Sequence, residues 1–162
     1  MLLLLARVHD TMSACVRRPI EATEGIRVIL KPFKGLGEVK FGMTVREVQR
    51  TLGIKDCKVT NKYLEEKTVF ADRVKYVFIE DTLTKIDIDY QDGIHLNDLD
   101  LFNQDVDVLL KGYSSESRKD AIHVKDLGLV LFKFRLKDRK KRWIWCYSKA
   151  AIRDYEHVLD IV

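Results

Sequence analysis

Residues 37–53 read GEVKFGMTVREVQRTLG, and this stretch joins a short apolar strand, a Gly-Met-Thr turn and one well-defined helix. Thr44 and Glu47 form a capping box, in which each side chain accepts a hydrogen bond from the backbone amide of the other residue. Gly53 supplies the left-handed residue that commonly ends a helix. Apolar residues recur at helical spacing, at Val45, Val48 and Leu52. The pattern therefore predicts a strand over residues 39–41 and a helix ending at Leu52.

Strand patterns surround this motif. Ile26, Val28 and Leu30 alternate with Arg27, Ile29 and Lys31 before Pro32, which predicts a first strand. Residues 69–79 and 83–90 alternate apolar and polar side chains across the turn at 80–82, which is typical of antiparallel strands with one face in water. Further strands are predicted over residues 94–102, 122–124, 127–136 and 143–147, with a short helix through Val106, Leu109 and Leu110.

The order of these elements predicts an α+β fold, an antiparallel sheet with helices packed on one side. Residues 1–25 are poorly patterned, and residues 26–162 form a single domain. Strand, helix and strands occur twice in outline, which indicates a weak internal duplication with pseudo-repeats at about 36–92 and 93–147. A C-terminal helix is predicted over residues 149–160, with its apolar side chains on one face.

Composition favours a folded protein of the cytoplasm. The 162 residues are 46% hydrophobic and 33% charged, with a formal net charge of +4. The cysteines at 15, 57 and 146 are odd in number and widely spaced, which predicts reduced thiols and neither a disulfide framework nor a zinc site. The apolar run after Met1 is about five residues, shorter than the roughly seven to fifteen of a signal peptide. An exported lipoprotein, with Cys15 in a lipoprotein-like box, is the minority interpretation.

The motif at residues 41–48, FGMTVREV, followed by Leu52 and Gly53, resembles two groups of proteins. One is the scaffold shared by outer-membrane assembly lipoproteins of the SmpA/BamE type and secreted beta-lactamase inhibitor proteins. The other is a set of small cytosolic bacterial proteins, several of them immunity proteins of polymorphic and contact-dependent toxin systems. Both resemblances imply function by binding another protein, and the unpaired cysteines and missing export signal favour the cytosolic set. The direct match covers residues 37–53, so it assigns no contact residue.

Aspartates gather in one part of the chain. Seven lie between Asp87 and Asp107, and this interval contains no lysine or arginine. Three interpretations stay open: a solvated sheet face, a docking surface for a basic partner, and a divalent-metal site at Asp87 and Asp89. A metal-dependent hydrolase would need a further group to activate water, and Lys85 is the nearby candidate.

Basic residues gather later. Seven lysines and arginines lie between Lys133 and Arg142, and WIWCY follows at 143–147. Cations beside aromatic residues are typical of nucleic-acid binding. The simpler interpretation is a solvated hairpin tip, with Trp143 and Trp145 half-buried in a strand.

Catalytic signals are weak. The four histidines are scattered without partners at a familiar ligand spacing, and the chain contains no Gly-x-Ser-x-Gly or Walker sequence. We therefore expect a non-enzymatic protein without a cofactor or metal.

These observations together predict a bacterial, cytoplasmic immunity protein that binds a cognate toxin, such as a basic nuclease, and occludes its active site. Membrane partners are not expected, and the rival interpretations are a nucleic-acid-binding module built on residues 133–147 and a metal-dependent hydrolase. The predicted partner-binding residues are Asp87, Asp89, Tyr90, Asp92, Asp98, Asp100, Phe102 and Asp105, with Tyr90 and Phe102 as aromatic anchors.

Overall fold

The computed structural model describes residues 27–62 and 65–155, and its first helix follows the local signals of residues 39–53. β3 (Val39–Lys40) leads through a turn into α1 (Val45–Leu52). The Glu47 amide donates to Thr44 Oγ1 at 3.4 Å and the Thr44 amide donates to Glu47 Oε2 at 2.8 Å. The second of these bonds lowers the pKa of Glu47. Gly53 ends the helix with a φ of 68°, so the predicted capping box and C-terminal cap are confirmed.

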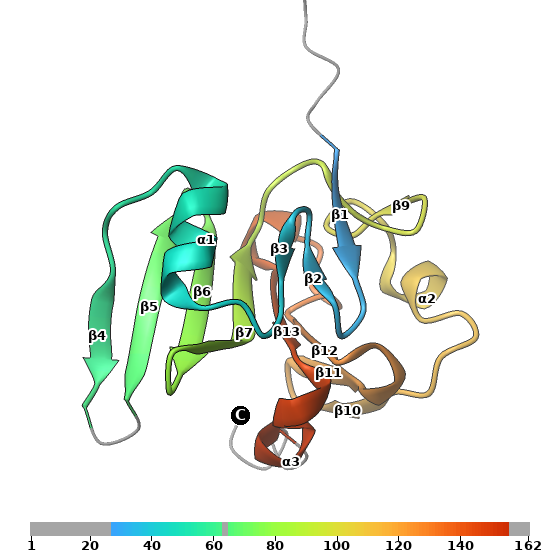
Figure 1. The fold of residues 1–162 in the computed structure, drawn as a ribbon. Coiled ribbons are helices and arrows are strands. Elements are labelled where there is room, and N and C mark those ends of the chain that lie inside the picture. The colour runs from blue at the N-terminus through green and yellow to red at the C-terminus, as the bar shows by residue number, and fades with distance from the viewer. Residues whose placement is uncertain (1–26, 63–64, 156–162) are drawn as a thin grey trace, which may run out of the picture.

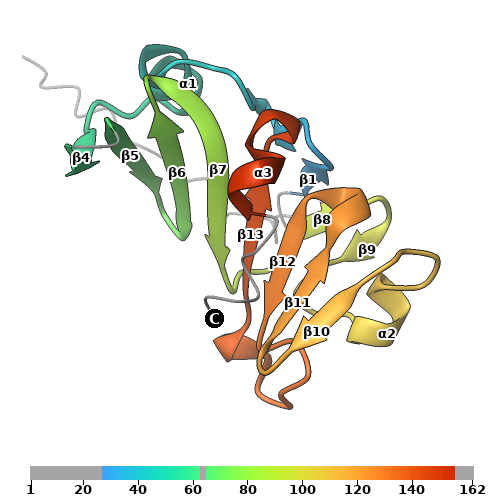
Figure 2. The same ribbon diagram turned by 90° about the horizontal axis from the view of Figure 1, so that it is seen from below.

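A large antiparallel sheet of eight strands runs through the molecule in the order β10-β11-β12-β13-β7-β6-β5-β4. Strands that are neighbours in sequence pair with one another along most of the sheet, while β7 and β13 pair across more than fifty residues of chain and lie side by side in Figure 2. The strands are β4 (Lys58–Asn61), β5 (Glu66–Ala71), β6 (Val74–Ile79), β7 (Thr82–Asp89), β10 (Glu116–Arg118), β11 (Ala121–Val124), β12 (Leu129–Phe132) and β13 (Trp143–Tyr147).

A smaller sheet has the order β3-β2-β1-β8-β9. Its remaining strands are β1 (Val28–Lys31), β2 (Gly35–Leu36), β8 (Ile94–Leu96) and β9 (Leu99–Asp100). β1 pairs with β8 in parallel, with Val28 opposite Ile94. The other strand pairings in this sheet are antiparallel. In Figure 1, α1 and the strands β1 to β3 lie in front of the large sheet.

The main core lies between the large sheet and the elements in front of it. Alternation along each strand decides which side chains enter this core, because successive residues point to opposite faces. On β7, Ile86 and Ile88 are fully buried while Asp87 and Asp89 lie on the other face. The other inward-facing residues include Val69, Tyr76, Phe78, Leu129, Leu131, Ile144 and Cys146.

The predicted α+β fold is wrong, because the structure is mostly β and consists of two sheets. Residues 28–40 and 94–100 were expected to join a single sheet, and they form the second sheet instead. That sheet covers much of the core surface that the prediction assigned to helices, and α1 packs mainly against β5. β7, from the first predicted pseudo-repeat (36–92), pairs with β13 from the second (93–147), and β1, which precedes both, pairs with β8.

The other helical segments are short. α2 (Val106–Leu109) matches the predicted short helix. The predicted C-terminal helix begins as a 3-10 turn over Lys149–Ala151 and continues as α3 (Ile152–Tyr155), while residues 156–160 and the N-terminal segment 1–25 lie outside the described residues. None of the helices that the structure describes is long and apolar enough to cross a membrane.

Candidate functional site

We call the face of the large sheet that is turned away from α1 the outer face. It carries a row of aromatic and charged side chains. One row crosses four strands, because Phe70 is opposite Lys75, Lys75 is opposite Asp87, and Asp87 is opposite Trp145. Side chains directly opposite one another on antiparallel strands are close enough to interact. The outer face consists of Phe70, Lys75, Lys85, Asp87, Asp89, Trp143 and Trp145, and these residues border a hollow of about 420 Å³.

Ion pairs organise the middle of the outer face. Asp87 accepts from Lys75 at 2.7 Å and lies 3.3 Å from Lys85 Nζ, and the side chains of Asp87 and Lys85 are each only 14% exposed. Lys85 Nζ also lies 4.3 Å from the centre of the Trp145 ring, a cation-π distance. Desolvated charges in fixed positions favour a partner with complementary charges and disfavour others.

Aromatic residues form one flank of the outer face. The rings of Trp143 and Trp145 meet edge to face at 5.3 Å, and Phe132 stacks on Trp143 with ring centres 3.6 Å apart. Both tryptophans are half-buried. On the other flank Phe70 is 49% exposed, with Lys58 Nζ 5.6 Å from its ring centre. Rigid aromatic surface of this kind is enriched among the residues that contribute most to protein binding.

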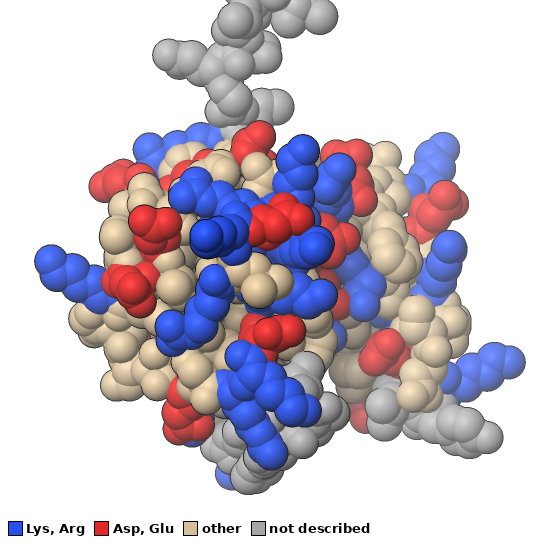
Figure 3. All heavy atoms as spheres, turned by 180° about the vertical axis from the view of Figure 1, so that it is seen from behind, with Lys and Arg blue, Asp and Glu red and all other residues tan. Residues whose placement is uncertain are grey.

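Charges of both signs cover this side of the molecule. Figure 3 shows lysines and arginines interleaved with aspartates and glutamates over the face opposite α1. Around the hollow, Arg73 and Lys75 alternate with Asp72 and Asp89. A groove that follows a nucleic-acid backbone is lined mainly by cations, so this mixture suits a protein surface better.

The predicted acidic surface is divided among several places. Asp87 and Asp89 lie on the outer face. Asp98 lies in the turn between β8 and β9 and pairs with Arg27 at 2.8 Å, and its side chain is 96% exposed. Asp105 precedes α2 and pairs with Arg139 at 3.3 Å. The acidic and basic segments of the sequence therefore meet at Asp105 and Arg139.

The four other predicted residues, Tyr90, Asp92, Asp100 and Phe102, lie in the segment between β7 and α2. Asp100 Oδ1 accepts from the backbone amides of Phe102 and Asn103 at 3.1 and 3.2 Å, so its carboxylate holds a turn. Asp92 accepts from the Tyr90 hydroxyl at 3.3 Å, and desolvation together with Asp92 raises the pKa of Tyr90. Phe102 is fully buried, which removes it from the surface as an anchor.

The basic segment is partly structural. Arg142 is 5% exposed, and its guanidinium donates to the carbonyls of Phe102, Gln104 and Phe134 at 2.8, 2.8 and 3.0 Å. It also stacks over the Phe134 ring at 4.9 Å. Arg142 therefore binds backbone carbonyls and is not available to a phosphate.

Metal and thiol chemistry find little support within the described ranges. These ranges contain no group of three or more His, Cys, Asp or Glu residues arranged to hold a metal ion, and Asp87 of the predicted metal site is paired with Lys75 and Lys85. Cys146 is buried, which raises the pKa of its thiol, whereas Cys57 is exposed.

Sequence reasoning found the parts of the outer face separately and missed Phe70. It placed Asp87 and Asp89 in one hypothesis and the tryptophans in another, because the pairing of β7 with β13 joins distant segments. The signal for Phe70 was present, since Phe70 alternates with the buried Val69.

No family model, curated protein or solved structure matches the chain.

Proposed function

We propose that this protein binds another protein through the outer face and acts by covering its partner's functional surface. The observation that carries the proposal is the row Phe70, Lys75, Asp87 and Trp145, which lies on the face of the large sheet turned away from α1 and borders the hollow. Aromatic residues lie on both flanks of this face, and aromatic residues are enriched at protein interfaces.

The partner that we propose is a bacterial toxin, which makes the protein an immunity protein. The support is the resemblance of residues 41–53 to immunity proteins and the presence of fixed carboxylates, Asp87 and Asp89, on the outer face. Asp89 is exposed and pairs with a lysine or arginine of a basic toxin such as a nuclease, while Asp87, held by Lys75 and Lys85, fixes the charges beside it, and binding blocks the toxin's active site. The proposal keeps these two predicted residues and replaces Phe102 by Phe70 and the two tryptophans as aromatic anchors.

Binding of single-stranded nucleic acid is the second candidate. Trp143 and Trp145 offer surfaces on which bases stack, and Lys85 lies beside Trp145. Asp87 and Asp89 oppose this function, because carboxylates repel phosphates at short range.

The test uses two variants that each remove an exposed apolar side chain. Phe70 is 49% exposed on the outer face and Val108 is 46% exposed on α2, so Phe70→Ser and Val108→Ser form a matched pair. Tagged wild type and both variants are exposed to extract of the source cells and washed with nuclease, and the retained proteins are identified by mass spectrometry. The proposed function predicts one stoichiometric protein that wild type and Val108→Ser retain and Phe70→Ser loses.

The other results discriminate between the candidates. Retention that disappears with the nuclease wash supports nucleic-acid binding. Equal retention by the two variants removes the outer face from the proposal. The toxin assignment requires in addition that the purified partner has a toxic activity and that a stoichiometric amount of this protein inhibits it.

A further inference from the structure

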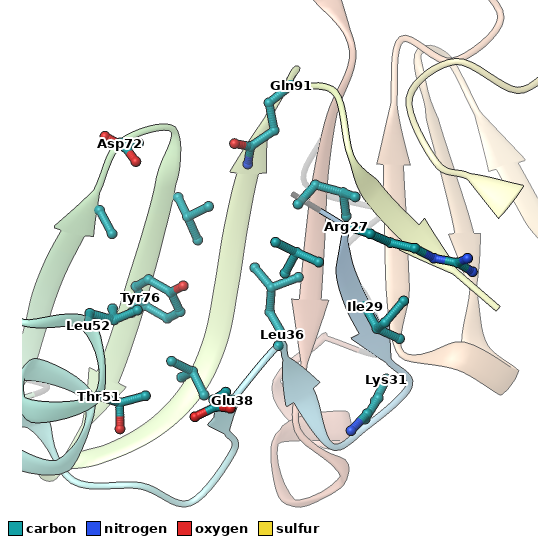
Figure 4. Close-up of a pocket in the computed structure, with 16 residues that line it drawn as sticks. Arg27, Ile29, Lys31, Leu36, Glu38, Thr51, Leu52, Asp72, Tyr76 and Gln91 are labelled. Atoms are coloured by element: carbon teal, nitrogen blue, oxygen red, sulfur yellow. The ribbon is translucent and has the colours of Figure 1, made fainter. Parts of the chain in front are cut away.

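A second cavity lies in front of the large sheet, on the opposite side from the outer face. It has a volume of about 620 Å³ and opens between the small sheet, α1 and the start of β6, as Figure 4 shows. This volume falls within the range of about 300–1,000 Å³ that is typical of small-molecule sites. Much of its wall is apolar, formed by residues that include Val28, Leu36, Val39, Leu52, Val74 and Ile94.

Two polar groups project into this apolar space. Figure 4 shows the Gln91 amide and the Tyr76 hydroxyl directed between the two sheets. The Gln91 Nε2 atom is buried, and none of the described residues accepts a hydrogen bond from it. Buried amide donors are rarely left without a partner, so this nitrogen marks a place for an acceptor atom that residues 27–62 and 65–155 do not supply.

Tyr76 provides a hydroxyl in the same cavity. The residue is 4% exposed, and burial raises its pKa to about 12. The hydroxyl is therefore protonated at neutral pH and available as a donor. Gln91 and Tyr76 together favour an oxygen acceptor on the ligand.

Charges of both signs line the mouth of the cavity. Arg27 and Lys31 lie there together with Glu38 and Asp72, and the guanidinium of Arg27 is held by Asp98 at 2.8 Å. Gln91 and Tyr76 therefore provide the interior groups that select an oxygen acceptor on the ligand.

We propose that this cavity binds a small, mainly apolar molecule that carries a carbonyl or carboxylate oxygen, and that Gln91 donates a hydrogen bond to this oxygen. Apolar contacts with the walls supply most of the affinity, because the interior offers few polar groups. This ligand site is independent of the protein partner proposed for the outer face.

Decanoate is a suitable probe, because it joins a carboxylate to a ten-carbon apolar chain. Titration of the full chain by isothermal calorimetry is expected to give one site. Gln91→Leu is expected to weaken decanoate binding by about five- to tenfold, the effect of one lost hydrogen bond. The same variant is expected to raise the melting temperature of the unliganded protein, since it removes an unpaired buried donor. Gln104→Leu, outside the cavity, is the control and is expected to leave binding unchanged.

A second variant tests the cavity itself. Leu52→Trp places a larger side chain in the space and is expected to abolish decanoate binding, with circular dichroism showing that the protein stays folded. Absence of decanoate binding to the wild type would overturn the proposal. A lower melting temperature of Gln91→Leu, with decanoate binding unchanged, would also overturn it and assign Gln91 a structural role.

Discussion

Replacement of Arg142 by methionine is expected to destabilise the protein strongly. Arg142 donates to three backbone carbonyls, those of Phe102 and Gln104 before α2 and that of Phe134 after β12. These segments are distant in sequence, and the guanidinium joins them by three hydrogen bonds. Methionine keeps much of the apolar stem and removes all three hydrogen bonds.

The magnitude follows from the number of bonds and from the burial of the charge. A hydrogen bond that involves a charged group contributes about 1.5–3 kcal/mol, so three give a gross loss of about 4–9 kcal/mol. Removal of the buried cation recovers part of this loss, because the guanidinium of Arg142 no longer has to be desolvated. We expect a net decrease of about 3–5 kcal/mol in the free energy of unfolding, a range typical of broken buried charge interactions.

Urea unfolding at 25 °C measures this effect, and Arg139→Met is the matched control. Arg139 makes a single ion pair with Asp105 at 3.3 Å, and both side chains are well exposed, so its loss is expected to cost less than about 1 kcal/mol. Arg142→Lys is expected to be intermediate, since one ammonium group cannot reproduce the planar fork. Equal stabilities of Arg142→Met and Arg139→Met would refute the reasoning.

Two further predictions concern stability. Gly128 has a φ of 63°, and a Cβ atom there would lie 2.5 Å from the Phe33 ring. Gly53 has a similar φ of 68°, but a Cβ atom there would meet no atom within 4 Å. Gly128→Ala should therefore lower the melting temperature more than Gly53→Ala. Equal shifts would contradict this reading of the Phe33 contact. His123 is 1% exposed, its Nε2 lies 2.5 Å from the Tyr147 hydroxyl, and burial lowers its pKa. The unfolded chain then binds the proton more tightly, so the contribution of His123 to stability is present above about pH 6.5 and is lost as pH falls through that value toward the folded pKa. Melting temperatures of wild type and His123→Gln from pH 7.5 to 5 should converge as the pH falls, and a constant difference would contradict the assignment.

Local features of the fold could be predicted from the sequence. The capping box of Thr44 and Glu47 and the glycine at 53 specify α1 through contacts within a few residues. Alternation along β7 likewise places Ile86 in the core and Asp87 outside it, because the period of a strand is two.

Features that depend on distant pairing could not be predicted. The alternation of residues 28–31 fits either sheet, and their pairings with β2 and, across more than sixty residues, with β8 place them in the smaller one. The pairing of β7 with β13 joins Asp87 to Trp145, two residues that the sequence places in separate charge segments. Arg142 belongs to a basic run by sequence and to the interior by structure, since charge counts do not show which backbone carbonyls a side chain reaches.

The central claim is that the outer face binds a protein partner, and the affinity of the retained partner tests it most directly. The dissociation constants of wild type, Phe70→Ser and Val108→Ser are measured by calorimetry with the purified partner. Loss of an anchor side chain of an interface typically costs about 2 kcal/mol or more, which corresponds to about a thirtyfold weaker Kd. The account predicts this change for Phe70→Ser and less than about a threefold change for Val108→Ser. Equal dissociation constants for the three proteins would contradict it.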